Sequence, residues 1–139
     1  KEAGECAIKD DFQTVRDKVL AAPGLMLASP VFFYTVSSHT KILMDRFQSL
    51  WVKKYWVDNT PKNQKIITRK GLFIAAGATK GKKLFDGSLL TIRYFFDVLD
   101  MELWKALLYR NLDFAEDIIK HPDYLREAYE TGKAFVDEL

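Results

Sequence analysis

The chain has 139 residues, of which 48% are hydrophobic and 14% aromatic, a composition that indicates a single folded domain over residues 1–139 and excludes a disordered chain. The 21 basic and 19 acidic side chains leave a net charge of +2, too small to indicate a nucleic acid or an anionic membrane as a partner. A single cysteine excludes an internal disulfide framework and favours a cytoplasmic location, and the longest nearly apolar run, Leu25 to Val36, is too short to span a bilayer.

The first regular element that the sequence predicts is a helix. Asp10 or Asp11 can cap its start, and Ala22-Pro23-Gly24 ends it. One face of this helix is apolar and carries Phe12, Val15 and Val19. A doubly wound α/β fold normally begins with a strand instead, and the loop after that strand holds the cofactor phosphate.

A strand, a loop and a helix follow in the segment Leu25 to Trp56. The apolar run Leu25 to Ala28 predicts a buried strand, which we expect to end at Pro30 because proline lacks the N–H that a sheet needs. Val31 to Val36 predicts a tight apolar loop, and Ser37 or Ser38 can cap the helix after it. The helix shows apolar spacing at Ile42, Leu43, Phe47, Leu50 and Trp51.

The rest of the chain repeats this alternation. After a polar surface connection at 57–69, the sequence predicts a strand over Leu72 to Ala76, a glycine loop over Gly77 to Lys83 and an amphipathic helix over Phe85 to Leu99. We expect a third strand over Leu103 to Tyr109, a short helical piece over Phe114 to Lys120, and a last helix that begins at Pro122. Alternating strands and helices predict a parallel sheet that is covered on both faces.

The loop after the first strand carries a resemblance to a known family. The run Ser29-Pro30-Val31-Phe32-Phe33, followed by Thr35-Val36-Ser37, Lys41 and Asp45-Arg46, resembles the second flavin loop and the next helix of the NAD(P)H-dependent FMN reductases. These flavodoxin-like proteins include the iron-sulfur flavoproteins. The family often has tyrosine where this chain has Phe32, so the hydrogen bond of that hydroxyl is not expected here.

This resemblance implies a flavodoxin-like three-layer αβα sandwich with a parallel sheet. In the family, about two strands and a helix, with the phosphate loop, precede this point. The chain therefore resembles the C-terminal portion of such a domain, and we expect its sheet to be completed by N-terminal elements or by another chain.

The implied function is that of an FMN-dependent NAD(P)H oxidoreductase that reduces a quinone, a nitro compound, a flavin or a metal cluster. Two alternatives stay open: a non-catalytic flavin carrier or assembly module, and a truncated piece that binds no cofactor. In a flavin enzyme the cofactor carries the hydride chemistry, so no side chain need be catalytic. The cofactor-binding residues implied are Ser29, Pro30, Val31, Phe32, Phe33, Gly77, Ala78 and Thr79.

Structural explanations compete with these assignments. Phe32, Phe33 and Tyr34 can equally be core or interface aromatics. The loop Gly77 to Lys83 lacks the Walker spacing, and Lys83 stands where a magnesium-binding hydroxyl is required. We therefore expect its lysines to form a solvated rim that attracts dinucleotide phosphates.

The remaining candidates for a ligand site are single residues. Cys6 resembles the last member of the cysteine cluster of iron-sulfur flavoproteins, but an iron-sulfur cluster needs several thiolates, so none is expected from this chain, and no other metal site is predicted. His39 and His121 are interpreted as surface or capping residues, and Asp45-Arg46 as a structural pair. The aromatic helix with Phe47, Trp51, Tyr55 and Trp56 has more apolar surface than one sheet face needs, which predicts a homo-oligomer.

Overall fold

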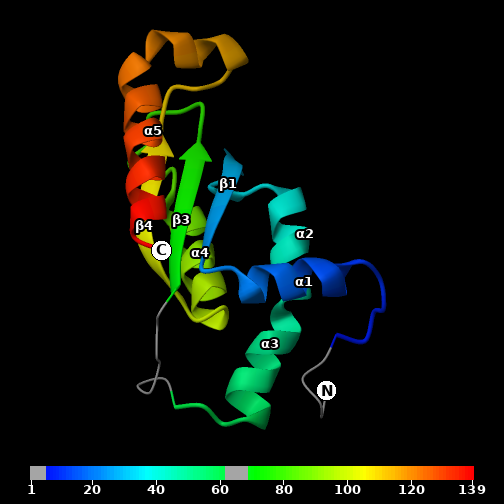
Figure 1. Cartoon of the computed structure of the whole chain (residues 1–139). Coiled ribbons are helices and arrows are strands. Elements are labelled where there is room, and N and C mark those ends of the chain that lie inside the picture. Colours follow the sequence, from blue (N-terminus) through cyan, green and yellow to red (C-terminus); the bar gives the residue numbers. More distant parts are fainter. Residues whose placement is uncertain (1–5, 62–68) are drawn as a thin grey trace.

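The strands of the described residues form one sheet, in the order β2-β1-β3-β4. The computed structural model describes residues 6–61 and 69–139. The strands are β1 (Gly24–Phe32), β2 (Thr35–Val36), β3 (Arg69–Ala76) and β4 (Met101–Tyr109). β1, β3 and β4 are parallel, as predicted (Figure 1), and the short β2 runs antiparallel to β1.

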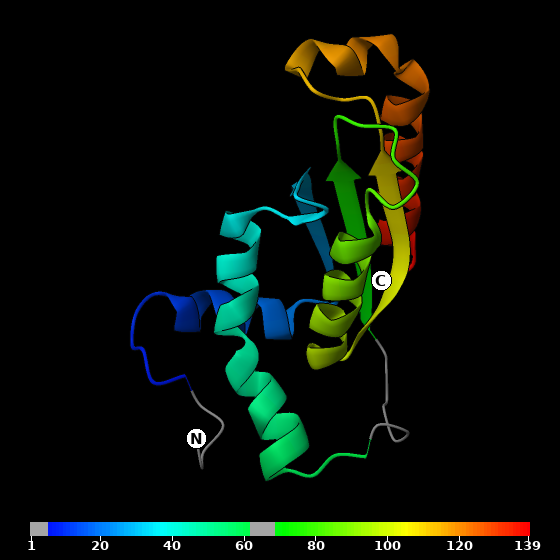
Figure 2. The ribbon, with the colours of Figure 1, turned by 180° about the vertical axis from the view of Figure 1, so that it is seen from behind.

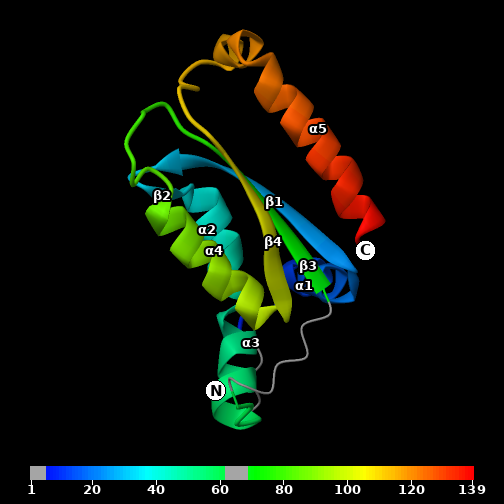
Figure 3. The same ribbon diagram turned by 90° about the vertical axis from the view of Figure 1, so that its left-hand side faces the viewer.

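Helices cover both faces of this sheet. α1 (Phe12–Ala21), α2 (Ser38–Arg46) and α4 (Asp86–Val98) lie on one face, and α5 (Pro122–Asp137) lies on the other (Figure 3). Seen from behind in Figure 2, α3 (Gln48–Val52) continues from α2 beyond the sheet. A π-helical turn, η1 (Lys53–Val57), follows α3, and a 3₁₀ helix, η2 (Ala115–Lys120), connects β4 to α5. The three-layer αβα prediction is confirmed.

Each face of the sheet has its own apolar core. On the α4 face the centre is aromatic: Phe47 lies edge-on to both Phe12 and Phe95, with ring centroids 4.9 Å and 5.4 Å away. On the α5 face, Phe135 is buried among Leu72, Leu107 and Tyr109. Burial of side chains of this size stabilises a fold by roughly 1.5–3 kcal/mol each, so the two cores fix both layers on the sheet.

Capping residues begin α2 and α5 as the sequence predicts. The hydroxyl of Ser37 accepts a hydrogen bond from the N–H of Thr40, and Pro122 occupies the first turn of α5. The helical spacing after Ser37 was expected to give one helix, but the structure divides it into α2, α3 and η1. Of the predicted connection at 57–69, residues 62–68 lie outside the described residues.

The prediction that the first strand ends at Pro30 is wrong. β1 continues through Pro30, which is the register partner of Ala76, to Phe32. Among the described residues, β1 pairs with β3 on one side, and on the other side it pairs with β2 only at Val31 and Phe32. A strand with one open side accommodates proline because the missing N–H can face away from the neighbouring strand. The expected loop is therefore a β-hairpin whose tip is Phe33-Tyr34.

A β-bulge changes the faces that sequence alternation assigns on β4. The register steps from Gly71 opposite Leu103 to Leu72 opposite Lys105, so Trp104 is the extra residue. Trp104 therefore packs against Phe135 of α5, on the same face as Leu107 and Tyr109, whereas strict alternation along the strand would place it on the same face as Ala106.

The α5 face of β1 is less covered than that of β3. Met26 in β1 is 54% exposed, and a hollow of about 520 Å³ lies between it and the α5 residues Ala128, Tyr129, Gly132 and Val136. Within residues 6–61 and 69–139, β1 thus has an open edge from Gly24 to Pro30 and a partly open face. Within the described ranges, no helix has the length and apolar character needed to cross a bilayer.

Candidate functional site

The two predicted loops leave neighbouring strands at the same edge of the sheet. Pro30 of β1 is the register partner of Ala76 of β3, and Gly77 follows Ala76 directly. Because parallel strands end at one edge, the β1-β2 hairpin and the loop after β3 begin side by side (Figure 3). This adjacency is the geometric requirement of the predicted site.

Buried serines hold the base of the hairpin. The Ser29 hydroxyl accepts a hydrogen bond from the backbone N–H of Ser37 at 2.9 Å and donates one to the carbonyl of Pro30 at 2.8 Å. Both serines are buried. The Ser29 hydroxyl thus bonds within the hairpin, and the cofactor-binding role of this residue stays a prediction.

The tip of the hairpin is strained and exposes aromatic side chains. Phe33 and Tyr34 have φ angles of 48° and 64°, a region that costs a non-glycine residue roughly 1–2 kcal/mol. Phe33 is fully exposed at 101%. Phe32 and Tyr34 are also exposed, so the interpretation of these three aromatics as core residues is excluded.

Tyr34 connects the hairpin to the second loop and to α4. Its backbone carbonyl accepts a hydrogen bond from the N–H of Ser88 at 3.1 Å. A Cβ atom at Gly87 would lie 2.4 Å from that carbonyl, so a side chain at this position would push the hairpin away. A Cβ atom at Gly81 would lie 3.8 Å from the Tyr34 hydroxyl, which places this ring beside the glycine loop.

The glycine loop divides into an anchored start and an exposed remainder. The N–H of Gly77 donates to the carbonyl of Tyr109 at 2.9 Å, and the carbonyl of Gly77 accepts from the N–H of Leu112 at 3.2 Å. A Cβ atom at Gly77 would lie 2.8 Å from Leu84. Gly77 therefore joins the ends of β3 and β4, and the residues after it, Ala78 and Thr79, are exposed.

The eight predicted site residues thus lie at one edge of the sheet, but they differ in how far they are exposed. Ser29 and Gly77 are buried, Val31 is half-buried against the α4 core, and the others are exposed. The sequence missed the contacts of Tyr34 with Ser88 and Gly87, because nothing in local spacing indicates that a helix 50 residues later supports the hairpin. The predicted binding roles themselves stay predictions.

Charged groups next to the glycine loop are solvated. Lys80, Lys82 and Lys83 are all exposed, as predicted. Arg110, which follows β4, places its guanidinium 4.8 Å from the centre of the Phe85 ring. The loop edge is therefore basic.

A second cluster that the sequence did not reveal surrounds Arg46. Its guanidinium binds both carboxylate oxygens of Asp10 at 2.7 and 2.8 Å, lies over the Phe12 ring, and approaches the Cys6 sulfur at 3.6 Å. The pKa of the Cys6 thiol is lowered mainly by a hydrogen bond with the backbone of Ile8 and, to a smaller extent, by the hydrogen bond from the Arg46 guanidinium. Asp45 pairs with Lys41 and Arg46 pairs with Asp10, so each residue has an ion pair of its own.

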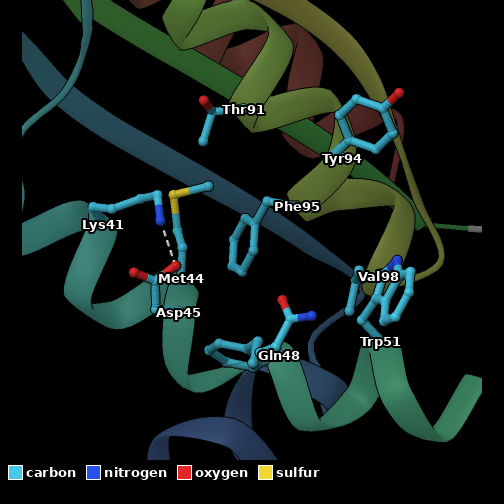
Figure 4. A pocket seen from close by; sticks show the side chains of 10 residues that line it. Lys41, Met44, Asp45, Gln48, Trp51, Thr91, Tyr94, Phe95 and Val98 are labelled. Carbon is cyan, nitrogen blue, oxygen red and sulfur yellow. Dashed lines mark hydrogen bonds and ion pairs between the residues drawn. The ribbon is translucent and has the colours of Figure 1, made fainter.

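A further hollow lies away from both loops, between α2, α3 and α4 (Figure 4). Its volume is about 270 Å³, and the ion pair of Lys41 and Asp45 lies on its α2 side. Trp51 forms one end of it, and Phe47 behind it is buried in the core. Of the four aromatic residues that were predicted to give this helix excess apolar surface, Trp56 is 62% exposed. Phe47 is buried, and the Tyr55 hydroxyl donates a hydrogen bond to Asp97.

Comparison with known proteins identifies relatives over most of the chain. The sequence is 46% identical over 50 residues to one iron-sulfur flavoprotein of Methanocaldococcus jannaschii, covering 36% of this chain and 26% of that protein. It is 30% identical over 104 residues to a second iron-sulfur flavoprotein of the same organism, covering 73% of this chain and 46% of that protein. The chain thus spans less than half the length of these relatives.

Solved structures share the fold. A Trp repressor binding protein from Bacillus subtilis matches with a TM-score of 0.60 at 18% identity, covering 84% of this chain and 68% of that one. A putative quinone reductase from Klebsiella pneumoniae matches with a TM-score of 0.56 at 12% identity, covering 88% of this chain and 54% of that one. The sequence model of the NADPH-dependent FMN reductases matches residues 1–102. The resemblance is therefore confirmed, and the chain belongs to the NADPH-dependent FMN reductase family.

Proposed function

We propose that the protein is an FMN-dependent NAD(P)H oxidoreductase and that the flavin ring binds between the β1-β2 hairpin and the loop after β3. The observation that carries this proposal is the meeting of the two loops at one sheet edge, with aromatic residues exposed there, in a member of the FMN reductase family. Bound FMN would accept a hydride from the nicotinamide and pass electrons to a second substrate.

The exposed residues suit the ring of FMN. Phe32 and Phe33 offer aromatic surface against which a flat heteroaromatic ring can lie, and the fixed hairpin holds that surface in place. Ala78 and Thr79 are small exposed residues on the opposite loop, where their backbone can approach the polar edge of the ring. Pro30 and Val31 fix the base of the hairpin beside them.

The phosphate end of FMN requires a further segment. We propose that residues 1–139 are the C-terminal portion of one flavodoxin-like domain, whose remaining strand pairs with the open edge of β1 and whose remaining helix covers Met26. The open edge, the exposed Met26 and the coverage of 26% and 46% of the relatives support this. A helix N-terminus in that segment would bind the phosphate.

The co-substrates follow from charge and from the relatives. The exposed Lys80, Lys82 and Lys83 suit the phosphates of NAD(P)H approaching the ring. A small-molecule acceptor, such as a quinone or a flavin, is favoured because the fold is shared with a protein described as a putative quinone reductase and with a flavone reductase. The protein is also proposed to be cytoplasmic and homo-oligomeric, and neither nucleic acid nor a membrane is expected as a partner.

The test is to titrate the purified protein with FMN and then add NAD(P)H without oxygen. We expect quenching of flavin fluorescence on binding and loss of the flavin absorbance band on reduction. Steady-state NAD(P)H oxidation with a quinone separates an enzyme from a flavin carrier, because a carrier is reduced only by its protein partner. Failure of both the chain and a longer form with the preceding residues to bind FMN would contradict the proposal. If only the longer form binds FMN, residues 1–139 are a truncated piece that binds no cofactor by itself.

A further inference from the structure

A small polar notch lies between the hairpin and the loop after β3. A Cβ atom built on Gly81 would lie 3.8 Å from the Tyr34 hydroxyl and 3.9 Å from Oγ1 of Thr79. Apart from the chain neighbours of Gly81, no other described atom lies within 4 Å of that point. We call this space the Gly81 notch and define it by Tyr34, Thr79 and Gly81. It joins the two loops between which the flavin ring is proposed to bind.

Backbone hydrogen bonds hold both sides of the Gly81 notch. On the hairpin side, the carbonyl of Tyr34 accepts from the N–H of Ser88 at 3.1 Å. On the loop side, the carbonyl of Gly81 accepts from the N–H of Leu84 at 3.1 Å, and the Leu84 side chain is buried in the core. The notch is therefore formed before any ligand arrives, and a ligand that fits it has little ordering of the protein to offset.

The two hydroxyls of the notch are free to bind a ligand. Tyr34 is 55% exposed, and Thr79 is exposed as well. In the described part of the chain, neither hydroxyl makes a hydrogen bond to another protein group. A carbonyl oxygen has two lone pairs and can accept from both hydroxyls at once. Lys80 and Lys82, exposed on either side of Gly81 in the chain, disfavour a cation there.

We propose that the Gly81 notch binds a ring carbonyl of a quinone-type electron acceptor and so determines specificity for that substrate. This inference rests on the proposed function, because it requires a flavin between the two loops. A quinone is flat and uncharged, so hydrogen bonds to its oxygen atoms must orient it in the site. NAD(P)H has phosphates that the exposed lysines can attract, and it depends less on such a notch.

Gly81→Ala tests the notch without disturbing the fold. The added Cβ atom would lie at ordinary contact distance from both hydroxyls, and the φ angle of Gly81 is outside the left-handed region, so alanine is accommodated. The methyl group fills the space that the carbonyl oxygen needs. The kcat/KM for a quinone, divided by that for ferricyanide, which has no carbonyl, should fall at least about fivefold. Gly132→Ala, with nothing within 4 Å of its Cβ atom, is the matched control and should keep the wild-type ratio.

Tyr34→Phe tests the hydrogen bond, because it keeps the ring and removes the hydroxyl. The same ratio should fall about threefold to tenfold, and the dissociation constant of the quinone from the oxidised, FMN-loaded protein should rise by a similar factor. The change in flavin absorbance on adding quinone measures that constant. Tetramethyl-1,4-benzoquinone is the probe, because its ring carbons are all substituted and the Cys6 thiol cannot add to them. Tyr94→Phe, at an exposed tyrosine of α4, is the matched control.

FMN titration of each variant separates the possible outcomes, with the form of the protein that binds FMN used throughout. A wild-type protein that binds no FMN in any form overturns the proposed function and this inference together. If wild type binds FMN and both variants keep its preference for quinone, this inference alone is wrong. Weaker FMN binding by both variants would mean that the flavin itself fills the notch. Slower flavin reduction by NAD(P)H with unchanged quinone binding would assign the notch to the nicotinamide, and either result overturns the inference.

Discussion

The buried hydroxyl of Ser29 accepts a hydrogen bond from the backbone N–H of Ser37 at 2.9 Å, and this bond reinforces the base of the hairpin that carries the candidate site. The same hydroxyl donates to Pro30, so both its hydrogen-bonding roles are used within the hairpin. The bond holds Ser29, near the end of β1, at a fixed distance from Ser37, the residue that caps α2. This bond, the pairing of β1 with β2 and the hydrogen bond from Ser88 to the Tyr34 carbonyl together position the exposed aromatics.

Ser29→Ala is expected to destabilise the fold and to weaken FMN binding. It leaves the buried N–H of Ser37 without its partner, which costs about 1–3 kcal/mol. Urea unfolding measures the first effect and flavin titration the second. Ser38→Ala is the matched control because Ser38 is exposed at the start of α2, and its effect should stay within about 0.5 kcal/mol. Equal effects of the two substitutions would contradict the role given to Ser29.

Substitutions at Phe33 should separate stability from binding. Phe33→Gly relieves the positive φ and should stabilise the protein by about 0.5–1 kcal/mol, while loss of the ring should weaken FMN binding about fivefold or more. Phe33→Ala removes the ring and keeps the strain. It should therefore weaken binding equally without the gain in stability. If FMN affinity is unchanged in both variants, Phe33 does not contact the flavin.

Two glycines test the packing of the sheet against its helices. A Cβ atom at Gly71 would lie 2.3 Å from the Phe96 ring, so Gly71→Ala should destabilise the fold by roughly 1–3 kcal/mol. At Gly132 in α5 nothing lies within 4 Å of the added atom, and Gly132→Ala should stabilise the helix by about 0.5–1 kcal/mol. Thermal unfolding of the two variants should move the transition in opposite directions.

Asp117 should contribute to stability in a defined pH range. The ammonium group of Lys120 and the N–H groups of Phe114 and Asp113 lower the pKa of the Asp117 carboxyl to about 2. Because the pKa of Asp117 is lower in the folded protein than the ordinary aspartate value of 3.8, the stabilisation is present above that value and is lost as the pH falls towards 2. Asp117→Asn should therefore be less stable than wild type at neutral pH, with the difference shrinking between about pH 4 and 2. Urea unfolding at several pH values measures this, and a constant difference across the range would contradict the assignment.

Much of the fold could be predicted because the relevant signals are local. The apolar run of β3, the serine cap of α2 and the spacing of Phe85, Leu89 and Ile92 in α4 each fix one element from neighbouring residues. The end of β1 was predicted wrongly at Pro30 because proline interrupts a strand only where its missing N–H would have faced a neighbouring strand. The Trp104 bulge was missed because strand alternation is read within one strand, whereas a bulge is defined by the partner strand.

The sequence by itself determined the order of the elements and, through the residues from Ser29 to Arg46, the family of this chain. Only the tertiary structure decided that Tyr34 rests on Gly87 and Ser88, that Gly77 joins two strand ends, and that Arg46 binds Asp10. These contacts join residues that are between 32 and 54 positions apart, and each depends on where two separate elements end in space. Local propensity carries no information about such distances, because they are set by strand register and by the packing of helices on the sheet.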